Sequence, residues 1–362
     1  MAHALHPGGT DGDFAGAACA QPVPAPAQQP QPEIARRLFT AYLHAGAHNA
    51  RLLHEYHTVA AALADAGLEA IPLKGIHLAT LVYPDPALRP MGDIDLLVRS
   101  TQVDTIGSLL LRLGYERFSP SRYDDPHAHH ETYHATGRAP VELHWHLGQH
   151  GDQRTRPVDM EGLWARAVAA KIDGLPTRVL APIDAFLYNC LHIYSHGFRV
   201  GLRRILDLRE ITRTATDALM AETLWTRAAA WRLTHPVAVL CEVLRLWLHV
   251  EFTLPIPRDA AFLAAVRMTQ ADLITIEDLS VDHVARLFGT QHWKAKAAAA
   301  FHQLFPPRSI MAARYGPVAQ TPGLYGLYAW RVVQALWKYS PISPARRTIR
   351  QRARFLTWVD AE

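Results

Sequence analysis

The segment "RPMGDIDLLVRS", residues 89–100, places two aspartates inside an apolar run. Side chains of a strand alternate between its two faces, so Asp93 and Asp95 are expected on one face, about 7 Å apart. Two carboxylates at that distance in a mostly apolar strand repel each other, which disfavours their ionisation. The segment therefore predicts a strand with an acidic face that needs a cation nearby.

A third carboxylate follows in "VELHWHL", residues 141–147. Glu142 and His144 would share one face of this strand, which is expected in the same sheet as the first. Convergence of Asp93, Asp95 and Glu142 would favour Mg²⁺ or Mn²⁺, which prefer oxygen ligands. Two such ions can activate an attacking oxygen and stabilise a leaving pyrophosphate. These three carboxylates are the candidate catalytic and metal-binding residues.

The residues around Asp93 and Asp95 indicate whether these aspartates have a catalytic or a structural role. An Asp-apolar-Asp pattern alone is common and more often marks an ion pair or a strand end. Upstream, "LKG" ends a predicted strand, and Gly75 begins a helix whose N-terminal amides could hold phosphate. Lys74 adds a cation there, and Arg89 stands just before the aspartates. Lys74, Gly75 and Arg89 are therefore the candidate nucleotide-binding residues.

The longer stretch "LKGIHLATLVYPDPALRPMGDIDLLV", residues 73–98, resembles the signature of the DNA polymerase β-like nucleotidyltransferase superfamily. It looks like a poorly characterised bacterial branch with Lys-Gly, Tyr-Pro, Arg-Pro and Gly-Asp-hydrophobic-Asp-Leu-Leu-Val. The segment "LYNCLHIYSHGFRVGLRRILDL", residues 187–208, resembles that branch more loosely. The resemblance implies that Asp93 and Asp95 bind both metal ions and that Glu142 is the third acidic residue.

The same resemblance implies that Lys74 and Gly75 lie in the turn that binds the triphosphate. The superfamily usually has Gly-Ser or Gly-Gly in this turn, whereas Ile76 follows Gly75 here. The contact with phosphate is therefore expected to differ from the usual one, with Lys74 as the substitute.

The predicted fold class is α+β, with a small mixed-sheet polymerase β-like core, a helical N-terminal preface and a large helical C-terminal region. The predicted regions are a disordered leader at 1–32, a nucleotidyltransferase catalytic domain with N-terminal helices at 33–156, and a mainly helical region at 157–362. The leader is rich in proline and glutamine and has no Lys or Arg, so it cannot bury enough apolar surface to fold.

Apolar spacing and turn residues predict the individual elements. Helices are expected at 33–67, 76–84 and 101–114, strands at 70–75, 93–98 and 115–118, and two hairpin strands at 129–136 and 141–147. The longest helix is expected to begin at Pro182 and to continue to residue 215.

If that long helix is continuous, His192, His196, Arg199, Arg203 and Asp207 form one polar stripe along it. The stripe could face solvent, or it could face the cleft, where arginine binds phosphate well. His192, His196 and Arg203 are thus candidate acceptor or phosphate contacts. The two histidines also have the spacing of a zinc pair.

Histidines are also frequent around the predicted hairpin. For His127, His129, His130 and His134, partly solvated side chains are the simplest interpretation. His144 shares the face of Glu142, which favours a place near the metal ions or the substrate about as much as a structural one. It is a further candidate acceptor or phosphate contact.

The composition is typical of a soluble globular protein, with 362 residues of which 49% are hydrophobic and 19% charged. The net charge of +4 is too small to indicate a nucleic-acid partner. No run is long and apolar enough to span a membrane, and the N-terminus lacks a signal peptide, so a cytoplasmic location is expected. The arginine-rich residues 344–358 predict a solvated basic helix, with nucleic acid or an anionic membrane surface as the alternative partner.

Together these features predict a metal-dependent nucleotidyltransferase. It is expected to move a nucleoside monophosphate (NMP) from a nucleoside triphosphate (NTP), ATP being the first choice, onto a small-molecule or peptide acceptor and to release pyrophosphate. Natural-product biosynthesis is the context that the resemblance implies. Two alternatives stay open: a catalytically degenerate nucleotide-binding module that regulates or serves as a scaffold, and a zinc-dependent hydrolase built on His192 and His196.

Overall fold

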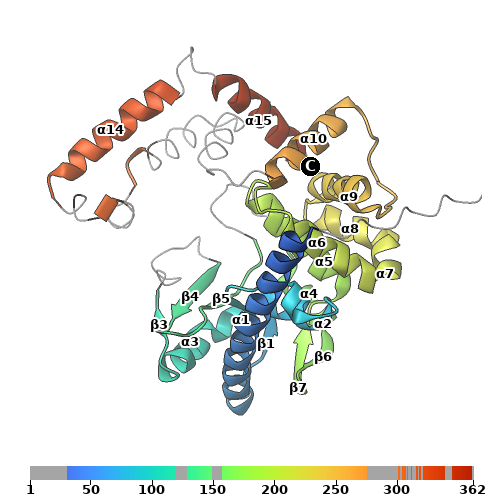
Figure 1. Cartoon of the computed structure of the whole chain (residues 1–362), viewed down its shortest axis with the longest axis vertical. Coiled ribbons are helices and arrows are strands. Elements are labelled where there is room, and N and C mark those ends of the chain that lie inside the picture. Colours follow the sequence, from blue (N-terminus) through green and yellow to red (C-terminus); the bar gives the residue numbers. More distant parts are fainter. Residues whose placement is uncertain are drawn as a thin grey trace, which may run out of the picture. The chain divides into compact units, whose positions relative to one another are not determined.

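The structure is a computed structural model of the whole chain (Figure 1). The residues that it describes are 31–118, 129–148, 157–274, 301, 304–306, 308, 311, 315–316, 318, 321–338 and 345–360. Most of the predicted disordered leader, at 1–32, and His127 lie outside the described residues.

Helix α1 (Pro32–Asp65) confirms the first predicted helix. The chain divides into two compact units, residues 1–41 and residues 42–362, so α1 begins in the first unit and continues in the second. In the second unit its buried apolar side chains recur every three or four residues and form one stripe. They are Leu52, Tyr56, Val59 and Leu63.

A mixed five-stranded sheet forms the centre of the large unit, in the order β1-β2-β5-β4-β3. Its strands are β1 (Ala70–Pro72), β2 (Ile94–Val98), β3 (Glu116–Arg117), β4 (His130–His134) and β5 (Val141–His144). Strands β2 and β5 pair in parallel, and the other neighbours pair antiparallel. The predicted strands and the predicted α+β class are therefore confirmed.

The connections between these strands are also close to the prediction. Helix α2 (Lys74–Leu81) follows β1, and helix α3 (Val103–Arg112) follows β2. The single-turn 3₁₀ helices η1 (Pro86–Leu88) and η2 (Ser100–Gln102) precede β2 and α3.

The two faces of the sheet pack against different partners. Ile94, Leu96 and Val98 of β2 belong to a core that includes the buried side chains of α1 and α3. Leu97 points the other way and belongs to a second core with the helical region. Because Asp95 alternates with Leu96 in the same strand, it lies on the face of Leu97. The acidic face of β2 is therefore the face turned toward the helical region.

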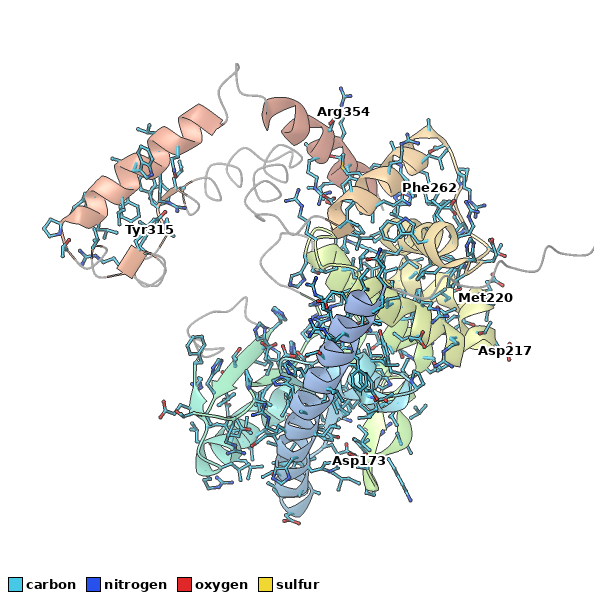
Figure 2. All side chains as sticks on the ribbon, viewed as in Figure 1. Asp173, Asp217, Met220, Phe262, Tyr315 and Arg354 are labelled. Carbon is cyan, nitrogen blue, oxygen red and sulfur yellow. The ribbon has the colours of Figure 1, made fainter. Side chains whose placement is uncertain are left out.

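The helical region begins with α4 and continues to the end of the described chain. Its helices are α4 (Met160–Arg166), α5 (Pro182–Ser195), α6 (Arg203–Thr214), α7 (Thr216–Met220), α8 (Glu222–Ala230), α9 (Thr234–Leu248), α10 (Ala260–Ile274), α14 (Gly323–Lys338) and α15 (Ala345–Val359). Phe262 of α10, labelled in Figure 2, is buried with its ring 6.1 Å from that of Trp358 in α15. Within the described residues, no helix is both long enough and apolar enough to cross a membrane.

A β-hairpin interrupts this region, which the sequence analysis describes only as mainly helical. Strands β6 (Val168–Ile172) and β7 (Leu175–Val179) pair antiparallel. Asp173, labelled in Figure 2, and Gly174 connect them with φ angles of 47° and 84°. Positive φ at both loop positions is what a type I′ turn requires, and Asp-Gly is a preferred pair there. The signal was present in the sequence and was missed.

The prediction of one continuous helix from Pro182 to residue 215 is wrong. Helix α5 ends at Ser195 because Gly197 and Phe198 both take positive φ angles, 63° and 64°. The Phe198 amide donates to the Ile193 carbonyl and the Gly197 amide to the Tyr194 carbonyl, which is a Schellman end. Helix α6 then starts at Arg203, so the predicted polar stripe does not exist as one helix face.

Candidate active site

Two predicted carboxylates meet on neighbouring strands. Asp95 of β2 and Glu142 of β5 are register partners in the parallel pair. His144 lies between them, with its Nε2 atom 2.9 Å from Asp95 Oδ1 and 3.2 Å from Glu142 Oε2. Ligand atoms of these three residues all lie within 4.8 Å of one another. The sheet register thus places two acidic groups and one imidazole on the same face.

Asp95 is the most buried of the three candidate carboxylates, with 1% of its surface exposed, and it has a cationic partner. The Lys74 Nζ atom lies 3.1 Å from Asp95 Oδ1. Burial raises the pKa of Asp95, but the Lys74 charge and the His144 hydrogen bond outweigh burial and hold that pKa well below its ordinary value. Burial likewise lowers the pKa of Lys74, but Tyr188 and Asp95 outweigh it and raise that pKa. The pair is therefore ionised inside the protein.

Asp93 is half-buried, immediately precedes β2, and is close enough to the other two carboxylates for their charges to affect its pKa. Burial, together with the negative charges of Asp95 and Glu142, raises the pKa of Asp93 to about 6, although Lys74 acts in the opposite direction. A carboxyl group with a raised pKa is one whose ionised form is unfavourable where it stands. The predicted acidic face thus carries more negative charge than Lys74 alone neutralises.

The turn between β1 and α2 is tight. Lys74 has a φ angle of 32°, in the left-handed region that a residue with a Cβ atom seldom adopts. At the next position, a Cβ atom on Gly75 would lie 3.3 Å from Arg89 Nη1 and 3.4 Å from Met91 Cγ. Such strain is frequent where a loop serves a functional site. The turn aims the Lys74 side chain at Asp95, and glycine suits the crowded position after it.

Arg89 has a buried partner in the helical region. Its Nε and Nη2 atoms donate to the two carboxylate oxygens of Asp207 in α6, at 3.1 and 3.0 Å. The Tyr83 hydroxyl donates to the same carboxylate at 2.9 Å. Both charged side chains are almost fully buried, so this bidentate pair ties the segment before β2 to α6. The nucleotide contact expected of Arg89 stays a prediction.

The other three candidate contacts lie around the interruption between α5 and α6. His192 is half-buried, and desolvation together with the charges of Lys74 and Arg204 lowers its pKa well below the ordinary value. His196 donates from Nδ1 to the His192 carbonyl at 2.9 Å, and Arg203 donates to the Pro90 carbonyl at 2.9 Å. Among the described residues, neither histidine belongs to a cluster of three ligand groups that could hold a metal ion. The zinc-pair alternative therefore has no geometric support.

Two residues of this site were not predicted. Tyr188 of α5 is buried, and the Lys74 Nζ atom lies 5.5 Å from its ring centre. Arg204, at the start of α6, is close enough for its positive charge to lower the pKa values of Asp93, Tyr188 and His192. Tyr188 precedes His192 by one helical turn, a signal that could have found it. Arg204 could not be found, because the choice between Arg203 and Arg204 depends on where α6 begins.

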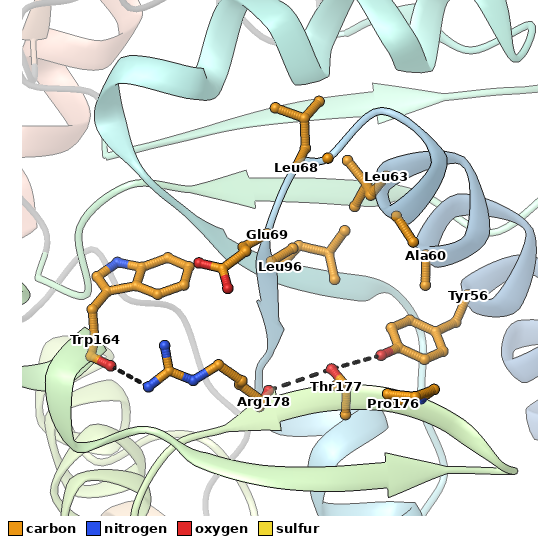
Figure 3. A pocket seen from close by; sticks show the side chains of 13 residues that line it. Tyr56, Ala60, Leu63, Leu68, Glu69, Leu96, Trp164, Pro176, Thr177 and Arg178 are labelled. Carbon is orange, nitrogen blue, oxygen red and sulfur yellow. Dashed lines mark hydrogen bonds between the residues drawn. The ribbon is translucent and has the colours of Figure 1, made fainter.

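A cavity of about 420 Å³ lies elsewhere in the large unit (Figure 3). Tyr56 and Leu63 of α1, Leu96 of β2, Trp164 of α4 and Arg178 of β7 are among its lining residues. Leu96 points away from the acidic face, since it alternates with Asp95 along β2. Of the candidate catalytic, nucleotide-binding and acceptor-binding residues, none lines this cavity. It is therefore separate from the carboxylate site.

Asp95 and Glu142 thus lie side by side on the sheet, and Lys74 contacts Asp95. A family model described as "uncharacterised nucleotidyltransferase" matches residues 16–249, more than half of the chain. The chain belongs to this nucleotidyltransferase family. It is thus an enzyme of the nucleotidyltransferase class, and the predicted superfamily is confirmed.

Solved structures of other nucleotidyltransferases are similar to this enzyme at a distance. A solution structure of the antibiotic-resistance factor ANT(2'')-Ia is 16% identical, with a TM-score of 0.37, over 50% of this chain and 90% of that chain. A crystal structure of ANT(2'')-Ia in complex with adenylyl-2''-tobramycin is 18% identical, with a TM-score of 0.35, over 50% of this chain and 96% of that chain. An antigenic nucleotidyltransferase-like protein from Paracoccidioides brasiliensis is 18% identical, with a TM-score of 0.35, over 56% of this chain and 94% of that chain.

Among curated proteins, no match is found.

Proposed function

We propose that this nucleotidyltransferase moves an NMP group from an NTP, with ATP as the first candidate, onto a small-molecule or peptide acceptor. The observation that carries the proposal is the pairing of Asp95 with Glu142 across the parallel strands, with Asp93 close enough to raise their mutual repulsion. A module that only binds nucleotide has no need for three acidic groups gathered beside one lysine. Because the three carboxylates repel one another and so destabilise the folded chain, their presence together favours a catalytic role.

The donor set fits a hard divalent cation such as Mg²⁺ or Mn²⁺. Asp93, Asp95 and Glu142 offer carboxylate oxygens, and the charge that remains after Lys74 is negative. When bound, such ions would neutralise the triphosphate and the attacking oxygen. We propose that these three carboxylates hold the metal.

The chain's own residues would supply positioning and proton transfer. In the transfer, an acceptor oxygen forms a bond to the α-phosphorus while the bond from that phosphorus to the pyrophosphate oxygen breaks. We propose that Glu142 accepts the acceptor's proton, because its side chain is partly exposed while that of Asp95 is buried. Asp95 has a different task, since Lys74 and His144 keep it ionised and fixed in direction.

Positive charge for the triphosphate would come from two places. Lys74 is the first residue of α2, and Gly75 after it lets the backbone approach closely. Arg204 stands at the start of α6, and its charge reaches Asp93. We propose that these two side chains contact the phosphates, that His192, His196 and Arg203 lie toward the acceptor, and that Arg89 positions the turn through Asp207.

The acceptor is proposed to be small. A net charge of +4 on 362 residues is weak for a partner with many phosphates, so a polyanionic acceptor is not favoured. Small peptides and hydroxylated natural products are therefore the first acceptors to test. A cytoplasmic location, where NTPs are available, belongs to the same proposal.

The test is incubation of the full chain with each of the four α-labelled NTPs, Mg²⁺ and a panel of acceptors. Transfer of label to an acceptor, with release of pyrophosphate in equal amount, is the expected result. A folded Glu142→Gln variant serves as the matched control and should release almost no pyrophosphate. Label transfer by Glu142→Gln at the rate of the unaltered enzyme would contradict the assigned role, and NTP binding without any transfer would favour the degenerate module.

A further inference from the structure

Three histidines gather at the end of the acidic face. His129 precedes β4, His130 is its first residue, and His144 is the last residue of β5. The antiparallel register sets His130 opposite His144. Ligand nitrogens of the three side chains lie within 4.8 Å of one another, and the His130 Nδ1 atom is 3.2 Å from His129 Nε2. Strands β4 and β5, with the residue that precedes β4, thus place three imidazoles close together.

This spacing is close to that of ligands on one metal ion. Zinc binds imidazole nitrogen at about 2.0–2.1 Å, which places two nitrogens of a tetrahedral site about 3.3 Å apart. The rings of His130 and His144 are stacked with their centres 5.1 Å apart, and those of His129 and His144 are 6.1 Å apart. The ligand nitrogens of all three rings therefore lie within the reach of a single ion.

His144 is oriented by carboxylates in the way that metal-binding histidines usually are. Its Nε2 atom is within hydrogen-bond distance of Asp95 and close to Glu142. A histidine that donates one ring N–H to a carboxylate has its other nitrogen directed and made more basic for a metal ion. For His144 the nitrogen left for a metal is Nδ1.

We propose that His129, His130 and His144 form a site for a transition-metal ion of the zinc class. Nitrogen ligands favour Zn²⁺, Co²⁺ or Ni²⁺, whereas the neighbouring carboxylates favour Mg²⁺ or Mn²⁺. Three protein ligands leave a fourth position for water or for a substrate group. The site adjoins the proposed catalytic carboxylates through His144, and it holds a different class of metal.

The experiment is titration of the metal-free full chain with Zn²⁺ by calorimetry, and with Co²⁺ by visible absorption. One ion per chain and a Co²⁺ spectrum of nitrogen ligation are expected. The variants His129→Asn and His130→Asn should each weaken Zn²⁺ binding by about 10-fold or more. His134→Asn is the matched control, because His134 lies on the same strand, is exposed and packs against Phe118. It should bind Zn²⁺ as the unaltered chain does.

Circular dichroism of each variant shows whether it is folded, and Asp93→Asn separates this site from the carboxylate site. That variant should lose NMP transfer but keep its affinity for Zn²⁺. Undiminished Zn²⁺ binding by a folded His129→Asn/His130→Asn double variant would overturn the proposal, as would loss of Zn²⁺ binding in Asp93→Asn or its absence in the unaltered chain. Failure of NMP transfer with Zn²⁺ binding intact would count only against the proposed function.

Discussion

Asp95 and Glu142 are register partners on two parallel strands, and the Nε2 atom of His144 is close to both carboxylates. Backbone hydrogen bonds of the sheet therefore fix the separation of the two acidic groups, and no loop has to close to bring them together. Lys74, the first residue of α2, completes the group. This rigidity suits an enzyme that works by positioning phosphate groups and neutralising their charge.

Replacing Asp93 tests the carboxylate site without disturbing the buried ion pair. Asp93→Asn should lower NMP transfer by about 100-fold or more, because one charged group that stabilises the transition state is lost. The same change removes a carboxylate whose raised pKa of about 6 reflects burial and repulsion. The melting temperature should therefore stay the same or rise. Pyrophosphate release and thermal unfolding measure the two effects, and full activity in the folded variant would argue against the site.

Variants of the Lys74–Asp95 pair separate its effect on stability from its effect on catalysis. Lys74→Met leaves the Asp95 charge buried without its cation and should cost about 3 kcal/mol or more of unfolding free energy. Adding Asp95→Asn removes the unpaired charge, so the double variant should recover much of that stability while remaining inactive. Denaturant unfolding of the two single variants and the double variant gives the coupling energy. Additive effects would show that the pair does not interact as described.

Arg204 is predicted to contact the triphosphate. Arg204→Ala should raise the KM for NTP about 10-fold, as expected for loss of one charge-assisted hydrogen bond. The matched control is Arg209→Ala on the same helix, since Arg209 is exposed and pairs with Glu210. Steady-state kinetics at varied NTP concentration distinguishes the two. Equal effects of both substitutions would indicate that only the general charge of α6 matters.

The lowered pKa of His77 predicts how the free energy of unfolding depends on pH. Burial, and then the charge of Arg89, lowers the pKa of His77 to about 4, whereas an unfolded chain has a histidine pKa of about 6.5. The folded form thus keeps His77 neutral, and its stability is complete above pH 6.5. As the pH falls from 6.5 to 4, the histidine of the unfolded chain is protonated while His77 in the folded chain stays neutral. The free energy of unfolding therefore decreases by about 3 kcal/mol over this range.

The substitution His77→Gln should remove that part of the pH dependence. Unfolding free energies between pH 7 and pH 4 should fall less steeply in His77→Gln than in the unaltered chain. The exposed His134 provides the control, because His134→Gln should leave the slope unchanged. An unchanged slope in His77→Gln would mean that His77 takes up its proton in the folded protein as readily as in the unfolded one.

Local periodicity explains which parts of the fold were predictable. The alternation in the two strands predicted that Asp93 and Asp95 share one face, and that Glu142 shares the face of His144. Helices α1, α2 and α3 followed from apolar spacing and from Gly and Pro at their ends. Such features depend on neighbours in the chain, so the sequence predicts them without knowledge of the fold.

The errors occurred where several weak signals had to be weighed. Gly197 and Gly201 both take positive φ angles, and together they end α5 and delay α6, whereas each glycine alone could be tolerated in a helix. Asp173 and Gly174 carried a hairpin signal that the helical pattern around them concealed. In both places the decisive information was local and present in the sequence.

The sequence by itself determined the acidic strands, the lysine between β1 and the body of α2, and membership of the nucleotidyltransferase family, because each rests on residues close together in the chain. Only the tertiary structure decided that Arg89 pairs with Asp207, that the charges of Arg203 and Arg204 lie near Asp93, and that His130 faces His144. These relations join segments between 14 and more than 100 residues apart. They depend on strand register and on where each helix begins, which only the packed chain specifies.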